Sequence, residues 1–495
     1  MPPQTVKDEL ASEVRRSRRT WLKMPVIGME SEFNVWLDEQ EINPELYWKH
    51  PGTFIDRTLL TREKSSLQLP TGGAVYFDRG VIEVVTPVIE LAPSCTARMV
   101  RNLWEQIGFV REQLTNWGRQ NGHTIRLTAY SSHYNISYEI PRSQQTSRHN
   151  IKSLALLLAY ILPVPVMVAG GNRRSTGVGV RPRGNRIEVT VDFTPDPGLM
   201  IATATLIVGI VREVMWWPSY ELSMIDKHGI PIVDGVIPGK HTTRKGWLTK
   251  DFHYPQSPYT SDIDATMWTT QFGDRRSLRQ MARDTAWTFR KSIRRFSDPF
   301  SFRLLFAVLE GRAPSLLDLT DRPAAYEDVG RLCKWGMVIH ELKNRETEAK
   351  LLEPIQQWRP PLEEHIASRQ HAREEKPDLK NAPTRPIPIR PIRPLRPIYL
   401  QRRNISLLPQ VERRRIPDRR KHAYRIPFPD RRLTRSAYER VFLKLVSGGH
   451  LRMGEDVYTP VGMKGWYHAV FRRESDGAER LLSIDQLLRR MRDWF

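Results

Sequence analysis

Residues 71–87 read TGGAVYFDRGVIEVVTP, two short runs of alternating character separated by Arg79-Gly80. Successive side chains of a β-strand point to opposite faces. Val75 and Phe77 are therefore expected in a core, whereas Tyr76, Asp78 and Glu83 face the other side. Carboxylates on an ordered strand are costly unless a cation compensates them. A metal ion, an amine or an arginine would serve, and a solvated sheet surface is the alternative for this stretch taken alone.

Three other stretches also place polar groups on one face of a predicted strand. They are residues 24–36, 123–140 and 186–193. Their apolar faces alternate with polar faces that carry Glu30 and Glu32 in the first, His133, Asn135 and Ser137 in the second, and Arg186, Glu188, Thr190 and Asp192 in the third. We therefore expect these strands to contribute to one site.

The residue types suggest divalent cations and phosphates. Mg²⁺ prefers carboxylate oxygens together with substrate phosphates, and arginine binds polyphosphate in a bidentate manner. The candidate metal ligands are Glu30, Glu32, Glu83, His133 and Glu188. The candidate phosphate ligands lie in a glycine-rich stretch and are Arg173, Arg174, Arg181, Arg183 and Arg186. Read singly, His133 could be a structural histidine, Arg173 and Arg174 a solvated loop, and Asp192 the partner of an arginine.

Length and cysteine content limit the class of protein. A chain of 495 residues has room for two or three domains and a substantial core. Two cysteines, Cys95 and Cys333, argue against a disulfide framework and fit a reducing cytoplasm. The longest apolar run, residues 198–211, is shorter than the ~20 residues that span a bilayer. We expect it to be a buried helix and expect no membrane partner.

The net charge of +22 is concentrated in one segment. Residues 376–435 hold 18 lysines and arginines against 4 acidic residues, an excess of 14. This segment is also proline-rich, which forbids helix and favours extended polyproline II. We interpret residues 368–436 as a basic linker that could dock an acidic partner, with a plain spacer as the alternative. The charge says little about the remaining body of the protein.

The other segments give a coarse domain plan. We expect a leader over residues 1–23, an irregular loop over 37–70, and helices from the Ser94 cap to Trp117, over 151–162 and over 199–216. Residues 218–365 are expected to be mainly helical after an irregular start, including amphipathic segments at 284–296 and 326–344. Residues 437–495 are expected to form a small α+β accessory domain, with strands near 448–449 and 466–471 and a closing helix.

Four motifs together resemble the carboxylate–amine ligase superfamily of glutamine synthetase, glutamate–cysteine ligase and the Pup ligase and depupylase enzymes. GMESEF at 28–33 is similar to the family's G-x-E-x-E-[FY] strand, and AVYFD-x₃-IE-x₂-TP at 74–87 resembles the Pup ligase and depupylase stretch. HYN at 133–135 is similar to the H-x-N strand, and RIE at 186–188 to the R-I-E strand of glutamine synthetase. The motifs keep the family order and cover roughly residues 24–217.

The resemblance implies an α+β fold with a glutamine-synthetase-like curved antiparallel sheet and flanking helices, in a catalytic domain over residues 24–367. It implies that Glu30, Glu32, Glu83, His133 and Glu188 bind Mg²⁺ around ATP. Asp78 would be the catalytic base and Arg186 would neutralise the transferring phosphoryl group. Asn135, Arg181 and Arg183 would bind ATP. The implied substrates are a peptide or small-protein carboxylate, often glutamyl, and an amine acceptor, joined as an amide or isopeptide.

Some positions depart from the Pup ligase pattern. Asn34 stands where that branch usually has glycine, and Tyr134 stands where it has glutamate. The interval from Glu32 to Asp78 is too short for the extra loop of depupylases, which favours synthesis over hydrolysis. Two alternatives stay open: an amidase or deamidase on the same scaffold, and a non-catalytic protein whose basic tether binds nucleic acid or an acidic partner.

Overall fold

The computed structural model describes residues 22–318, apart from 63–64, 141–144, 147–148, 172–174, 176, 242–244 and 251–252, and residues 436–494. These residues belong to one compact unit. The leader up to residue 21, the helix expected at 326–344 and nearly all of the basic linker lie outside the described residues. Arg173 and Arg174 also lie outside them.

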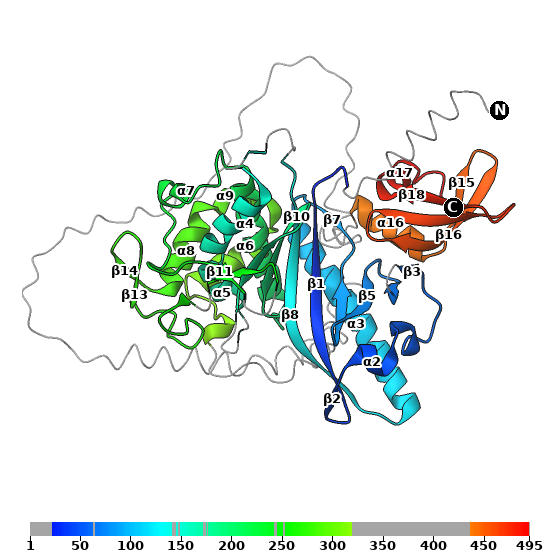
Figure 1. The fold of residues 1–495 in the computed structure, drawn as a ribbon, viewed down its shortest axis with the longest axis horizontal. Coiled ribbons are helices and arrows are strands. Elements are labelled where there is room, and N and C mark those ends of the chain that lie inside the picture. The colour runs from blue at the N-terminus through cyan, green and yellow to red at the C-terminus, as the bar shows by residue number, and fades with distance from the viewer. Residues whose placement is uncertain are drawn as a thin grey trace, which may run out of the picture. The chain divides into compact units, whose positions relative to one another are not determined.

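A large mixed sheet organises the described residues (Figure 1). Its strand order is β11-β12-β9-β10-β8-β1-β6-β5-β4-β3-β16-β17-β18, with β2 and β7 paired to β1 and β15 to β16. The strands before residue 320 are β1 (Val26–Leu37), β2 (Gln40–Ile42), β3 (Thr61–Arg62), β4 (Ser66–Gln68), β5 (Ala74–Asp78), β6 (Val81–Val85), β7 (Ile89–Glu90), β8 (Ile125–Ser137), β9 (Gly179–Pro182), β10 (Arg186–Val191), β11 (Gly239–Lys240) and β12 (Leu248–Thr249). A separate pair is formed by β13 (Trp268–Thr269) and β14 (Arg275–Arg276).

The helices of the first part are α2 (Pro44–Trp48), α3 (Cys95–Asn121), α4 (Ile151–Ile161), α5 (Pro163–Gly170), α6 (Pro197–Met215), α7 (Ser223–Lys227), α8 (Leu278–Thr288), α9 (Arg290–Phe296) and α10 (Pro299–Leu309). Helices α3 and α6 pack on the apolar side of the central strands and against each other. Ile27, Met29, Ile136 and Ile187 supply that side and are buried. The opposite side of the same strands is left to polar residues.

The apolar helix α6 illustrates why hydropathy alone does not place a segment in a membrane. The helix has 19 residues, and an 18-residue window within it has a mean hydropathy of 1.7, so it is long and apolar enough to cross a bilayer. The bent pair α4–α5 passes the same test when taken as one span. In the structure 89% of the apolar window of α6 is buried inside the protein. Helices α3, α9 and α10 surround it, so α6 is a core helix here, as its sequence predicts.

Residues 437–494 form the C-terminal module. It consists of α16 (Ala437–Val446), β15 (Leu451–Met453), β16 (Asp456–Lys464), β17 (His468–Arg473), β18 (Glu479–Ser483) and α17 (Ile484–Arg489). The module has a hydrophobic core of its own. Its strand β16 pairs in parallel with β3, and the backbone N–H of Tyr438 donates to Glu90 at 2.7 Å. The module therefore continues the main sheet.

The prediction of an α+β fold is confirmed, and several details are corrected. The sheet is mixed, because β3 and β16 run parallel. Residues 37–70 contain short helices and strands in place of an irregular loop. Ser94 adopts a left-handed conformation and makes no side-chain capping bond, and α3 continues past Trp117 until Gly122 caps it.

The helix expected over residues 151–162 is confirmed as α4, which ends at Ile161 just before Pro163. Pro163 also starts a second helix that was not expected, because it occupies the first turn of α5, where its missing N–H costs nothing. The first strand of the C-terminal module starts at Leu451, because Gly448 takes a positive φ in the turn before it.

Candidate active site

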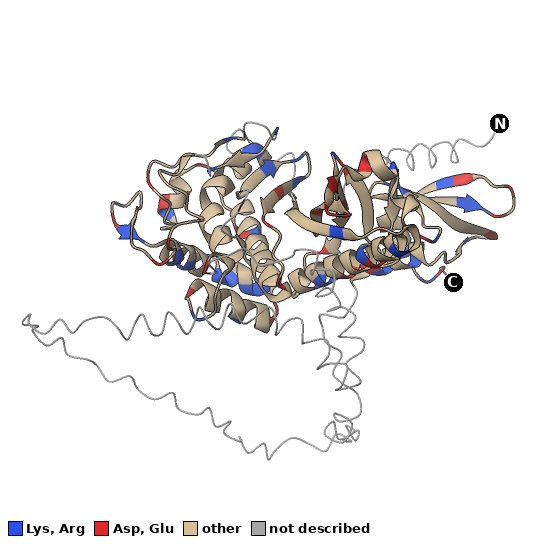
Figure 2. Cartoon of the chain, turned by 90° about the horizontal axis from the view of Figure 1, so that it is seen from below, with Lys and Arg blue, Asp and Glu red and all other residues tan. Residues whose placement is uncertain are grey.

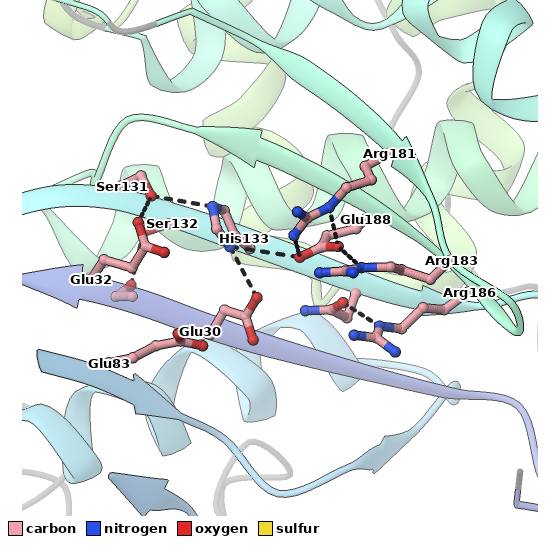
Figure 3. Close-up of polar contacts among 12 residues, drawn as sticks. Glu30, Glu32, Glu83, Ser131, Ser132, His133, Arg181, Arg183, Arg186 and Glu188 are labelled. Atoms are coloured by element: carbon pink, nitrogen blue, oxygen red, sulfur yellow. Dashed lines mark hydrogen bonds and ion pairs between the residues drawn. The ribbon is translucent and has the colours of Figure 1, made fainter. Parts of the chain in front are cut away.

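The five predicted metal ligands lie on the polar face of four neighbouring strands (Figure 3). Glu30 lies opposite His133 in the β1–β8 ladder, and Glu32 lies opposite Glu83 in the β1–β6 ladder. Glu188 comes from β10, the strand beyond β8. In Figure 2, acidic and basic residues lie on the strands near the centre of the view. The strand pairing thus brings together residues that are far apart in the sequence.

Glu30, His133 and Glu188 form a first cluster. One ligand atom of each lies within 4.8 Å of the others. The imidazole Nδ1 of His133 lies 2.9 Å from Glu30 Oε1 and 3.7 Å from Glu188 Oε1. These three residues, all predicted metal ligands, could hold one divalent cation between them.

Glu32, Asp78 and Glu83 form a second cluster, again with ligand atoms within 4.8 Å of one another. Glu83 is buried and accepts a hydrogen bond from the phenol of Tyr76, whereas Asp78 is exposed at the end of β5. An all-carboxylate set is typical of Mg²⁺ or Mn²⁺ sites. Asp78, predicted as the catalytic base, therefore lies beside the predicted ligands.

The charges of the two clusters explain why a cation fits here. Burial and the neighbouring Glu30 and Glu32 raise the pKa of Glu83 well above its usual value. Burial alone would raise the pKa of Glu30, but the hydrogen bond and charge of His133 outweigh it and lower that pKa to about 2. Burial opposes protonation of His133, yet Glu30, Glu32 and Glu188 raise its pKa. A divalent cation would relieve this repulsion among carboxylates.

The predicted ATP ligands lie at one end of the clusters. Arg181 binds Glu188 through two nitrogens at 2.7 and 2.8 Å, and Arg183 Nε binds the same carboxylate at 2.8 Å. Arg186 Nε donates to Asn135 Oδ1 at 2.6 Å, and its charge helps to lower the pKa of Glu30. The predicted groups are thus brought together, with Arg181 and Arg183 engaged by a predicted metal ligand.

Two adjoining cavities contain these groups. The larger, of about 1270 Å³, is lined by both clusters and by Arg62, Arg186 and Lys245. The other, of about 910 Å³, has a largely apolar wall that includes Met24, Val26 and Val88. Both cavities share Glu30, Arg186, Gly465 and Trp466. The two cavities therefore meet beside Glu30 of the first cluster and Arg186.

The C-terminal module supplies residues that the sequence did not reveal. Trp466 lies in the turn between β16 and β17, and the guanidinium of Arg62 lies 4.0 Å from its ring centre. The neighbouring Tyr467 hydroxyl accepts a hydrogen bond from Asn185 at 3.0 Å. Nothing in residues 462–468 marks this turn as part of the site. Tyr76, by contrast, was detectable from its place on the same strand face as Asp78.

The comparison with solved structures gives a distant likeness. No family model and no curated protein matches this sequence. Among solved structures, the chain is similar to the complex between the prokaryotic ubiquitin-like protein Pup and its ligase PafA, with a TM-score of 0.37 and 12% identity. The match covers 67% of this chain and 72% of the other. It is too remote to assign residues, so the site rests on this chain's own geometry.

Proposed function

We propose that this protein is an ATP- and Mg²⁺-dependent carboxylate–amine ligase. The observation that carries the proposal is the pairing of two ligand clusters on one sheet face, Glu30–His133–Glu188 and Glu32–Asp78–Glu83, beside Arg186 in a single cavity. The four motifs that resemble the superfamily supply these same residues. Bound Mg²⁺ would supply charge compensation for the phosphates and the transferring phosphoryl group.

The shape of the two cavities supports an orientation for the nucleotide. The cavity of about 910 Å³ suits a purine base, with an apolar part of its wall and with Trp466 and Tyr467 among its lining residues. The phosphates would then lie where the cavities meet, near Arg186 and Asn135. Arg181 and Arg183 would turn from Glu188 towards phosphate, because an arginine fork binds either group. That exchange would leave Glu188 free for a cation.

The chemistry that follows has two steps. An oxygen of the substrate carboxylate attacks the γ-phosphorus, so that an acyl phosphate and ADP form while Arg186 offsets the developing charge. The amine nitrogen then attacks the acyl carbon, the C–O bond to phosphate breaks, and Asp78 accepts the proton lost by the amine. The exposed position of Asp78 at the end of β5 suits a group that meets an incoming amine.

Phosphorus NMR of Mg²⁺-ATP tests the proposal. The protein is incubated with amino acids and acidic peptides, and Glu83→Gln and the exposed Glu45→Gln serve as variants. The proposal predicts ADP and phosphate with wild type and Glu45→Gln, only when a carboxylate substrate is present, and none with Glu83→Gln. ATP that binds and persists would favour the amidase alternative. Absence of ATP binding would contradict both enzyme functions and leave binding by the basic segment, with a steep salt dependence.

A further inference from the structure

Ser131 lies between the two ligand clusters and contacts both. Its hydroxyl donates to Glu32 Oε2 at 2.6 Å and lies 3.2 Å from the Nε2 of His133 (Figure 3). The other imidazole nitrogen, Nδ1, faces Glu30 and Glu188. A continuous path of hydrogen bonds therefore runs from Glu30 through His133 and Ser131 to Glu32.

A β-bulge places Ser131 on this face. In the β1–β8 ladder Glu32 pairs with Ser131, but the next residue, Phe33, pairs with Ala129, so Tyr130 is an extra residue. Leu127 and Ala129 belong to the hydrophobic core, and simple alternation would send Ser131 there as well. The extra residue reverses the alternation, and a bulge of this kind re-aims side chains next to functional sites.

The hydrogen bonds of Ser131 assign a proton to the Nε2 of His133. A serine hydroxyl has one hydrogen, and Ser131 gives it to Glu32. Its oxygen can then only accept from His133, so Nε2 carries a proton in this arrangement. In the metal-free protein Nδ1 also carries a proton, which it donates to Glu30, and Nδ1 would be the atom that binds a cation in place of that proton. Partners of this kind set the tautomer of metal-binding histidines.

We propose that Ser131 is a positioning residue that couples the two clusters, orienting His133 in one and Glu32 in the other. This inference rests on the proposed function, because it assumes that both clusters bind cations. Since one hydroxyl holds a ligand of each cluster, its loss should weaken both cation sites together. A residue that served only the fold would not affect the two affinities in this way.

Ser132 provides a matched control. It is the next residue, it is also buried, and its hydroxyl lies 2.8 Å from that of Ser31 on the opposite face of the strand. Ser132→Ala removes the same atom from the same strand without touching either cluster. Ser131→Thr keeps a hydroxyl at the bridging position. The three variants therefore separate the bridging contact from general effects of the strand.

The test is titration of the full chain with Mn²⁺, followed by electron paramagnetic resonance and calorimetry, with thermal unfolding of the metal-free variants alongside. We expect two Mn²⁺ sites in wild type and in Ser132→Ala. We expect Ser131→Ala to lose 10- to 100-fold in Mn²⁺ affinity at both sites, the range for partners of metal ligands. Its unfolding temperature without metal should be unchanged. Ser131→Thr should recover the Mn²⁺ affinity at both sites. Wild-type affinity at either site of Ser131→Ala would overturn the coupling but leave the proposed function standing. Absence of Mn²⁺ binding by wild type would overturn both.

Discussion

Arg181 and Glu188 lie directly opposite each other on β9 and β10, and the guanidinium binds both carboxylate oxygens. The pair brings a predicted phosphate ligand and a predicted metal ligand into one contact. Arg183 binds the same carboxylate, so Glu188 is neutralised without a cation. Nucleotide and metal binding should therefore depend on each other at this position.

Replacement of Arg181 tests that dependence. Without nucleotide, Arg181→Gln should raise the affinity of the Glu30–His133–Glu188 cluster for Mn²⁺ by about tenfold, or ~1.4 kcal/mol, because Glu188 loses its bidentate partner. The same variant should bind ATP more weakly. Calorimetry measures both affinities. Arg126→Gln is the control, since Arg126 pairs with the exposed Glu39 elsewhere on β8. If the affinities for Mn²⁺ and for ATP both fell or both rose, Arg181 and the cation would not be competing for Glu188.

The pKa of Glu83 predicts how metal-free stability depends on pH. This pKa is raised in the folded protein above its value in the unfolded chain. The contribution of the Glu83 carboxyl to the free energy of unfolding is therefore fully present below the unfolded pKa of about 4.3 and is lost as pH rises towards the folded value. Glu83→Gln cannot ionise and should remove that loss, so the variant should gain stability relative to wild type as pH rises. Thermal unfolding in EDTA from pH 4 to 8 measures the difference, and a constant difference would contradict it.

Asp78 should matter for protonated amines more than for neutral nucleophiles. General-base catalysis contributes about 10²- to 10⁴-fold, so Asp78→Asn should slow ligation of an alkylamine by that factor. Hydroxylamine is largely unprotonated at neutral pH and should be affected much less. The rates of amide and of hydroxamate formation, each measured for wild type and Asp78→Asn, give the loss with each nucleophile. Asp38→Asn is the control, because Asp38 lies in the turn beyond β1. An equal loss with both nucleophiles would remove Asp78 from the role of base.

Trp466 should contribute to nucleotide affinity from the C-terminal module. Stacking of a base on an aromatic ring is worth about 1–3 kcal/mol, so Trp466→Ala should weaken ATP binding by about 10- to 100-fold. Trp466→Phe should keep most of the affinity, because the ring also packs on Phe442. Fluorescence or calorimetric titration with ATP distinguishes the variants. Unchanged affinity in Trp466→Ala would place the base outside the cavity of about 910 Å³.

The sequence predicted the parts of the site that depend on alternation. Burial alternates along all of β1, so Glu30 and Glu32 share a face as expected. Glu83 and Glu188 likewise follow from the period of two in β6 and β10. The order of the motifs along the chain then indicated that these strands belong together.

The remaining parts depend on information that a local pattern does not carry. The place of Ser131 on the polar face comes from a bulge at Tyr130, which is visible only from the pairing of β8 with β1. Trp466 reaches the site because β16 pairs with β3, about 400 residues away in sequence. Pro163 follows the end of α4 and also occupies the first turn of α5, and a proline in the sequence marks the stop without showing that a new helix starts there.

The most direct test of the central claim is trapping of the activated carboxylate. The protein is incubated with Mg²⁺-ATP, acidic peptides and hydroxylamine, and hydroxamate and ADP are both quantified by mass spectrometry. A carboxylate–amine ligase predicts equal amounts of hydroxamate and ADP with wild type, and neither with Glu83→Gln. ADP without hydroxamate, or hydroxamate that forms without ATP consumption, would contradict activation of the carboxylate by phosphorylation.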